Sequence, residues 1–155
     1  MQSTMVSDRV DFNPIGLDGM EFVEYVSPAP ELLAQLFQKL GFKKIGQHKN
    51  KNVELYRQRG VNFILNKEEN SFAESFRKAH GPSICATGFR VKDANKAMEM
   101  AVARGARRYT GEGHAFPAIY GIGDSLIYFI DNYKNDQVYN NDFEFFADKV
   151  QKGVG

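Results

Sequence analysis

The segments LGFKKIG (residues 40–46) and RGARRYT (residues 104–110) align with Gly41 over Gly105, an offset of 64 residues. VNFIL (residues 61–65) and SLIYF (residues 125–129) align at the same offset. Each half has the pattern of a strand, a helix and three further strands. A repeat of this length indicates two copies of one supersecondary unit, paired so that each covers apolar surface that the other exposes.

In the first half, hydrophobic periodicity and turn residues set the predicted elements. Ser71 and Glu74 form a capping box at the start of a short helix that Gly81 and Pro82 end. The predicted elements are a strand at 20–27, a helix at 30–40, strands at 42–48, 53–58 and 61–66, and the short helix at 71–80.

In the second half, the same signals recur in the same order. Asp93 is the predicted N-cap of a helix that ends at Gly105. Strands are predicted at 84–91, 106–110, 117–121 and 125–131. The sequence therefore predicts an α+β fold of two βαβββ units in a pseudo-twofold arrangement, with units at about 19–67 and 82–132.

Alternation along the strands predicts which side chains lie under the helices and which face a cup. The more apolar alternates are expected under helices on the outer face of a curled mixed sheet: Val23, Tyr25, Val53, Leu55, Val61, Phe63, Leu65, Cys85, Phe89, Ile127 and Phe129. The other alternates are mixed in polarity. The ligand-facing candidates among them are Glu24, Tyr56, Asn62, Arg90 and Tyr128.

The composition is that of a globular protein, with 43% hydrophobic and 25% charged residues in 155. A net charge of +1 supplies no strong field for nucleic acid or an anionic membrane. No apolar run reaches bilayer length, and residues 1–14 lack the features of a signal peptide. Cys85 is the only cysteine, which indicates a reducing compartment, and we expect a cytoplasmic protein.

Several segments, in order, resemble one family. NPIGLDGMEFVEYVSP (13–28), LGFKKIGQHKNKNVELYRQRGVNFILN (40–66), HGPSICATGFRVKDANKAMEMAVARGA (80–106) and PAIYGIGDSLIYFID (117–131) are similar to the N-terminal half of 4-hydroxyphenylpyruvate dioxygenases, in the vicinal oxygen chelate superfamily. The likeness spans roughly residues 13–133. It implies a flexible segment at 1–13, one domain at 14–133, and a linker at 134–155 toward a C-terminal catalytic domain.

The resemblance implies an iron(II) enzyme that converts 4-hydroxyphenylpyruvate and dioxygen to homogentisate and carbon dioxide in tyrosine catabolism. In this family the iron lies in the C-terminal half, so we expect this chain alone to be inactive and to bind no metal. The chain is expected to be a fragment that ends before that half and self-associates. Two alternatives remain open: a stand-alone glyoxalase-like binding module, and the N-terminal half of a hydroxymandelate synthase.

Repeat logic places the family's iron ligands at about Phe22, Ile84 and Tyr128, none of which suits ferrous iron. Two interpretations of Glu24 are open: a ligand-facing acid, which includes the case of a lone metal ligand, or a carboxylate paired with Arg90, Asn62 or water. The three histidines lack a shared spacing and are expected at the surface or as caps: His48, His80 and His114. Cys85 is expected to be a packed core thiol. The basic stretch 43–59 is expected to be a solvated hairpin.

Overall fold

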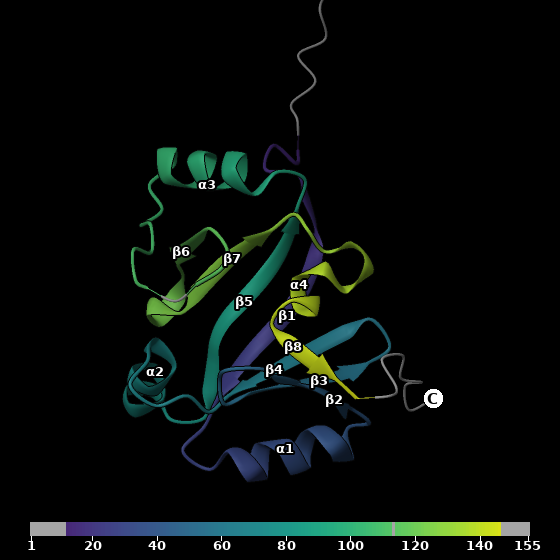
Figure 1. The fold of residues 1–155 in the computed structure, drawn as a ribbon. Helices are drawn as coiled ribbons and strands as arrows, with labels where there is room; N and C mark the ends of the chain where they lie inside the picture. The colour runs from purple at the N-terminus through teal and green to yellow at the C-terminus, as the bar shows by residue number, and fades with distance from the viewer. Residues whose placement is uncertain (1–11, 113, 147–155) are drawn as a thin grey trace, which may run out of the picture.

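The computed structural model describes residues 12–112 and 114–146, which form one eight-stranded sheet with helices around it (Figure 1). The first half contains β1 (Leu17–Val26), α1 (Pro30–Lys39), β2 (Lys43–His48), β3 (Val53–Gln58), β4 (Val61–Asn66) and α2 (Phe72–His80). The second half contains β5 (Ser83–Val91), α3 (Ala94–Ala103), β6 (Ala118–Tyr120), the 3₁₀ turn η1 (Ile122–Asp124) and β7 (Leu126–Ile130). The 3₁₀ turn η2 (Lys134–Asp136), α4 (Gln137–Asn140) and β8 (Phe143–Phe145) follow.

The strands lie in the order β6-β7-β5-β1-β4-β3-β2-β8. The opening strands of the two halves, β1 and β5, pair antiparallel at the centre of the sheet. Each of them pairs in parallel with the last strand of its own half, β1 with β4 and β5 with β7. This pairing is the same on both sides of the β1–β5 junction and agrees with the predicted α+β architecture.

The helix ends follow the predicted capping residues. The Ser71 side chain accepts a hydrogen bond from the Glu74 amide, and the Asp93 side chain accepts one from the Lys96 amide. Gly41 follows α1 with φ +91° and Gly105 follows α3 with φ +101°, the left-handed conformation that glycine adopts most easily. The two aligned glycines of the repeat therefore end equivalent helices.

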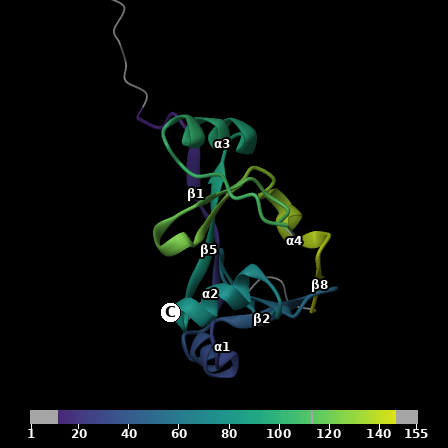
Figure 2. The same cartoon turned by 90° about the vertical axis from the view of Figure 1, so that its left-hand side faces the viewer.

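α1 and α3 cover the outer face of the sheet, as predicted, and Figure 2 shows them at opposite ends of the molecule. Under α1, aromatic rings from the helix, the following loop and the strands pack together, including Phe37, Phe42 and Phe63. Under α3, Ala97 and Met98 contact Val91 and Phe129. In the described part of the chain, no helix is long and apolar enough to span a bilayer.

The other two helices lie on the concave side, which differs from the prediction. Ala73 and Phe76 of α2 pack against Val26 and Leu126, and α4 packs over the opposite end through Tyr139. Residues 134–146 were expected to belong to a linker. Instead β8 pairs with β2 and completes the sheet, because Val138, Tyr139 and Phe143 bury their side chains in the concave core.

Two strand predictions were also wrong. Residues 106–110 form no strand of their own, and only an isolated bridge joins Arg108 to Ile119. In β3 the predicted faces are reversed. The register Leu55 to Ile64 and Tyr56 to Phe63 puts Val53 and Leu55 on the concave side and Tyr56 under α1.

Candidate functional site

The concave face contains a cavity of about 520 Å³ between the sheet, α2 and the segment that leads into β8. Its floor comes from the middle of β1, β4 and β7. Aromatic rings and ionisable side chains share the lining, which includes Phe22, Glu24, His48, Lys51, Val53, Ile64, Asn66, Phe72, Tyr109, Phe116, Leu126, Tyr128, Tyr139 and Phe143. The volume lies within the range of small-molecule sites.

Glu24 is the part-buried acid on the floor of this cavity, on the face that the sequence predicted. Its Oε2 accepts a hydrogen bond from Cys85 Sγ at 3.1 Å. Burial raises the pKa of Glu24, while hydrogen bonds from Cys85 and Asn66 and the charge of Lys51 act in the opposite direction. The expected pairing with Arg90 or Asn62 was wrong, because other groups engage both of those side chains.

Cys85 reaches Glu24 because of a bulge in β5. Glu24 pairs with Ala86 and Tyr25 pairs with Ile84, so the register shifts by one residue at Cys85. The thiol is fully buried, and burial and the neighbouring Glu24 raise its pKa far above the usual range. The prediction of a packed core thiol is confirmed, but its place under the outer helices was wrong.

Tyr128 and Phe22 form the aromatic part of the floor. Their ring centroids lie 6.0 Å apart, and Phe116 packs edge-on against Tyr128 at 6.2 Å. Burial, and then the charge of Glu24, raises the pKa of the Tyr128 phenol above its ordinary value. A Cβ at Gly88 would come within 2.7–2.9 Å of the Phe22 ring, so only glycine leaves room for this ring position.

The three positions that repeat logic equates with iron ligands do not converge. Phe22 and Tyr128 line the cavity, but the β5 bulge leaves Ile84 paired opposite Tyr25 and 46% exposed. A hydrocarbon and a phenol do not fit ferrous iron. Within residues 12–112 and 114–146, no group of three or more His, Cys, Asp or Glu side chains could hold a metal.

Two of the three histidines lie at the cavity, which spacing in the sequence did not reveal. His48 Nδ1 accepts hydrogen bonds from the amides of Asn50 and Lys51, both at 3.1 Å, so it caps the β2–β3 turn as expected of a capping histidine. Burial lowers the pKa of His48. His114 contacts the Phe116 carbonyl through Nδ1, and His80 packs on Phe76 away from the cavity.

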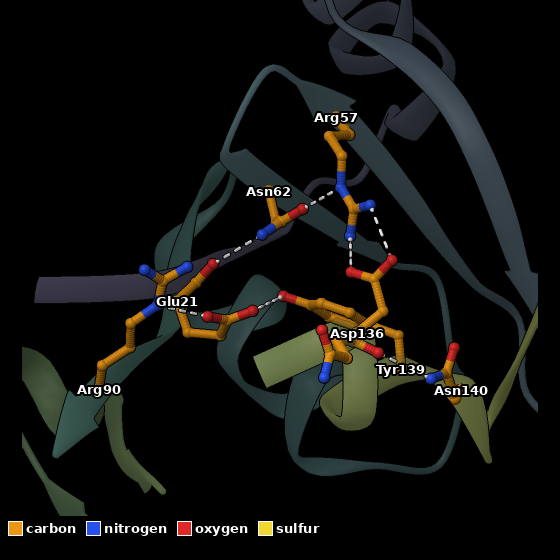
Figure 3. Close-up of polar contacts among 8 residues, drawn as sticks. Glu21, Arg57, Asn62, Arg90, Asp136, Tyr139 and Asn140 are labelled. Atoms are coloured by element: carbon orange, nitrogen blue, oxygen red, sulfur yellow. Dashed lines mark hydrogen bonds and ion pairs between the residues drawn. The ribbon is translucent and has the colours of Figure 1, made fainter. Parts of the chain in front are cut away.

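The opposite end of the concave face is closed by a polar network centred on Glu21 (Figure 3). Glu21 Oε2 accepts from Arg90 Nε at 2.6 Å, and Oε1 accepts from the Tyr139 hydroxyl at 2.9 Å. The Arg90 guanidinium also lies 5.2 Å from the centre of the Tyr133 ring. Burial and Glu21 together raise the pKa of Tyr139 well above its usual value.

A second ion pair joins this network to the segment before α4. Arg57 holds Asp136 through two guanidinium nitrogens, at 2.8 and 3.3 Å. Arg57 Nε also donates to Asn62 Oδ1 at 2.6 Å, and Asn62 Nδ2 donates to the Glu21 carbonyl at 3.0 Å. These contacts tie β1, β3, β4 and α4 together.

The five predicted ligand-facing residues therefore separate into three groups. Glu24 and Tyr128 line the cavity, whereas Asn62 and Arg90 belong to the Glu21 network. Tyr56 lies under α1 with its hydroxyl bonded to Glu54, and its predicted place on the cup was wrong. The face of Tyr56 could have been predicted from the two-residue turn Arg59-Gly60. This turn pairs Arg57 with Asn62 and therefore fixes which side chains of β3 and β4 share a face.

Comparison with known proteins gives a consistent result. The chain matches the sequence profile described as "Hydroxyphenylpyruvate dioxygenase, HPPD, N-terminal" over residues 12–144. Protein MelA of Shewanella colwelliana is 48% identical over 141 residues, covering 89% of this chain and 41% of that protein. A 4-hydroxyphenylpyruvate dioxygenase of a Pseudomonas species is 43% identical over 148 residues, covering 92% and 42%.

Among solved structures, a xylose isomerase-like TIM barrel/4-hydroxyphenylpyruvate dioxygenase fusion protein superposes with a TM-score of 0.80 at 34% identity. The match covers 90% of this chain and 23% of that one. The chain thus spans about two fifths of the length of each of these two relatives, 41% of protein MelA and 42% of the Pseudomonas dioxygenase.

Proposed function

Because this chain belongs to the hydroxyphenylpyruvate dioxygenase N-terminal domain family, we propose that it is the non-catalytic N-terminal half of a 4-hydroxyphenylpyruvate dioxygenase. The observation that carries the proposal is the match over residues 12–144 in a chain that spans about two fifths of its relatives. The complete enzyme would convert 4-hydroxyphenylpyruvate and dioxygen to homogentisate and carbon dioxide in the cytoplasm, as a step of tyrosine catabolism.

In this proposal the residues of the chain act as a scaffold. Iron(II), held by the other half, would supply the oxidative chemistry, and no residue at the Phe22, Tyr128 or Ile84 positions would contribute a ligand. The partner of this chain would be the catalytic domain, with homo-oligomerisation as a further role. Phe146, which directly follows β8, is 47% exposed and offers apolar surface for such a partner.

A chimera tests the proposal directly. Residues 12–146 replace the matching part of the Pseudomonas dioxygenase, and homogentisate formation is measured with iron(II) and ascorbate. We expect turnover by the chimera and none by the 155-residue chain alone. Turnover by the chain alone, or a folded and iron-loaded chimera without turnover, would contradict the proposal.

Metal binding by the chain itself is a separate measurement. We expect anaerobic calorimetric titration with ferrous ion to show no stoichiometric site of micromolar or tighter affinity. If such a site is found, Glu24→Gln is the first variant to test, because Glu24 is the acid on the cavity floor.

We also propose that the two halves are related by a pseudo-twofold axis. Support comes from the matching parallel pairs, β1 with β4 and β5 with β7, on either side of the antiparallel β1–β5 junction. Residues near 20–66 should superpose on residues near 84–130 in an experimental structure, and failure to do so would refute the two-unit division.

A further inference from the structure

The cavity offers a small molecule both aromatic surface and a carboxylate. Phe22, Phe116 and Tyr128 supply ring surfaces that already contact one another. The Tyr128 ring also lines the cavity and is partly buried. Ring faces and a phenol oxygen attract cations and hydrogen-bond donors.

The charges that line the cavity are strongly unequal. Five carboxylate side chains contribute to the lining: Glu24, Glu68, Glu69, Glu112 and Asp142. Lys51 is the single lysine or arginine among the described lining residues, and it is exposed at the turn after β2. His48 and His114 also line the cavity, and burial favours the neutral form of His48. Glu69, Glu112 and Asp142 are exposed, as Lys51 is, but the carboxylates outnumber the lysine, so the lining is net negative and disfavours a carboxylate ligand.

Glu24 is the acid that a ligand would meet on the floor. Glu24 accepts a hydrogen bond from the Cys85 thiol, which is a weak donor, and one from the Asn66 side chain, and the charge of Lys51 acts on it. An ionised carboxylate has about four lone-pair sites, so it can still accept a hydrogen bond from a ligand. A partly buried carboxylate is costly unless a cation or strong donor approaches it. An ammonium group above Glu24 would supply the cation that the carboxylate needs, and the organic body of the same ligand would pack against Phe22 and Tyr128.

We propose that the cavity binds a small organic cation, an amine or quaternary ammonium group joined to an aromatic or apolar body. Glu24 accepts the charge, and the rings of Phe22, Phe116 and Tyr128 enclose the body. This role is additional to the proposed place in a dioxygenase, whose substrate is an acid that this net negative lining disfavours. It uses the concave face of this half for binding without a metal.

The test compares three ligands of one shape on the unaltered 155-residue chain. Phenethylamine is the cation, 2-phenylethanol its neutral counterpart and phenylacetate the anion. Amide chemical shifts in ¹⁵N-labelled protein give both the affinity and the location of binding. We expect phenethylamine to bind at least about tenfold more tightly than the alcohol, with shifts at Phe22, Glu24 and Tyr128, and phenylacetate to bind least.

Glu24→Gln should remove the preference for the amine, so that the variant binds the amine and the alcohol with similar affinity. Glu99→Gln, on the exposed surface of α3, is the matched control and should behave as the unaltered chain. Equal binding of the amine and alcohol, tighter binding of phenylacetate, shifts outside the cavity, or no binding at all would overturn the proposal. The ligand ranking does not depend on the variant folding. It uses this chain alone, so its failure leaves the proposed dioxygenase role intact.

Discussion

Glu21 and Glu24 lie three residues apart on β1, and their side chains lie at opposite ends of the concave face of the sheet. Glu21 is 4% exposed and bonded to an arginine and a tyrosine hydroxyl. Glu24 lines a cavity and is bonded to a thiol. The difference comes from what covers each end. α4 brings Tyr139 onto Glu21, whereas α2 packs beside Glu24 with the small Ala73 and leaves a volume open. Glu21 therefore stabilises the fold, whereas Glu24 remains accessible to a ligand in the cavity.

The largest effect is expected from Glu21→Ala. This change leaves the buried Tyr139 hydroxyl without its acceptor and Arg90 without its carboxylate. We expect a loss of about 2–3 kcal/mol in the free energy of unfolding, less than for a fully buried pair because solvent reaches Arg90. Urea denaturation of this variant beside Glu24→Ala measures the contrast. Equal losses would show that the two ends do not differ in this way.

Gly88→Ala tests how tightly the floor of the cavity is packed. The added methyl group would overlap the Phe22 ring, which must then move. We expect a loss of about 1–2 kcal/mol and a weaker response of the cavity to phenethylamine. Gly60→Ala is the control, since a Cβ there meets no atom within 4 Å and should cost little. A neutral Gly88→Ala would mean that Phe22 repacks freely.

The cap at His48 gives a smaller, pH-dependent effect. At neutral pH, His48→Ala should cost about 0.5–1 kcal/mol because two turn amides lose their acceptor, while His48→Asn keeps an acceptor oxygen. The pKa of His48 is lowered in the folded state from its ordinary 6.5, so its contribution is complete above 6.5 and falls as the pH drops below that value. His48→Asn should lack this fall in urea titrations at pH 5 to 8.

The smallest effect should come from Glu24→Gln, with the opposite sign to Glu21→Ala. The pKa of Glu24 is raised in the folded state from its ordinary 4.5, so ionisation lowers stability as the pH rises above that value. The variant should therefore be slightly more stable than the original chain at neutral pH. The gain should vanish below about pH 4.5. Thermal unfolding at several pH values measures it, and a loss at neutral pH would show that Glu24 supports the fold.

The sequence was informative where the relevant interactions are local. Ser71 and Asp93 cap their helices through amides three residues along the chain, and Gly41 and Gly105 end equivalent helices. The 64-residue offset also predicted the strand and helix order. Glu24 and Tyr128 lie on the predicted face because the pairing of their strands is regular from Phe22 to Glu24 and from Leu126 to Ile130.

The sequence misled where a strand is buried on both faces or contains a bulge. All of Val53–Arg57 is buried, so alternation gave no signal for which of Leu55 and Tyr56 faces the cup. The register shift at Cys85 moved the thiol to Glu24, and a second shift between Met20 and Phe22 lies beside Glu21. Bulges depend on the partner strand, so a single strand does not reveal them.

The sequence by itself determined the helices and strands and the repeat of one unit, and these set the architecture. Caps, turns and periodicity depend on residues that are close along the chain. Only the tertiary structure decided which glutamate is neutralised and which faces a cavity. Tyr139 meets Glu21 across 118 positions, and Asp136 meets Arg57 across 79. Such pairs require that the segment before β8 packs back onto the sheet, and the energy of a buried charge depends on the groups that packing brings to it.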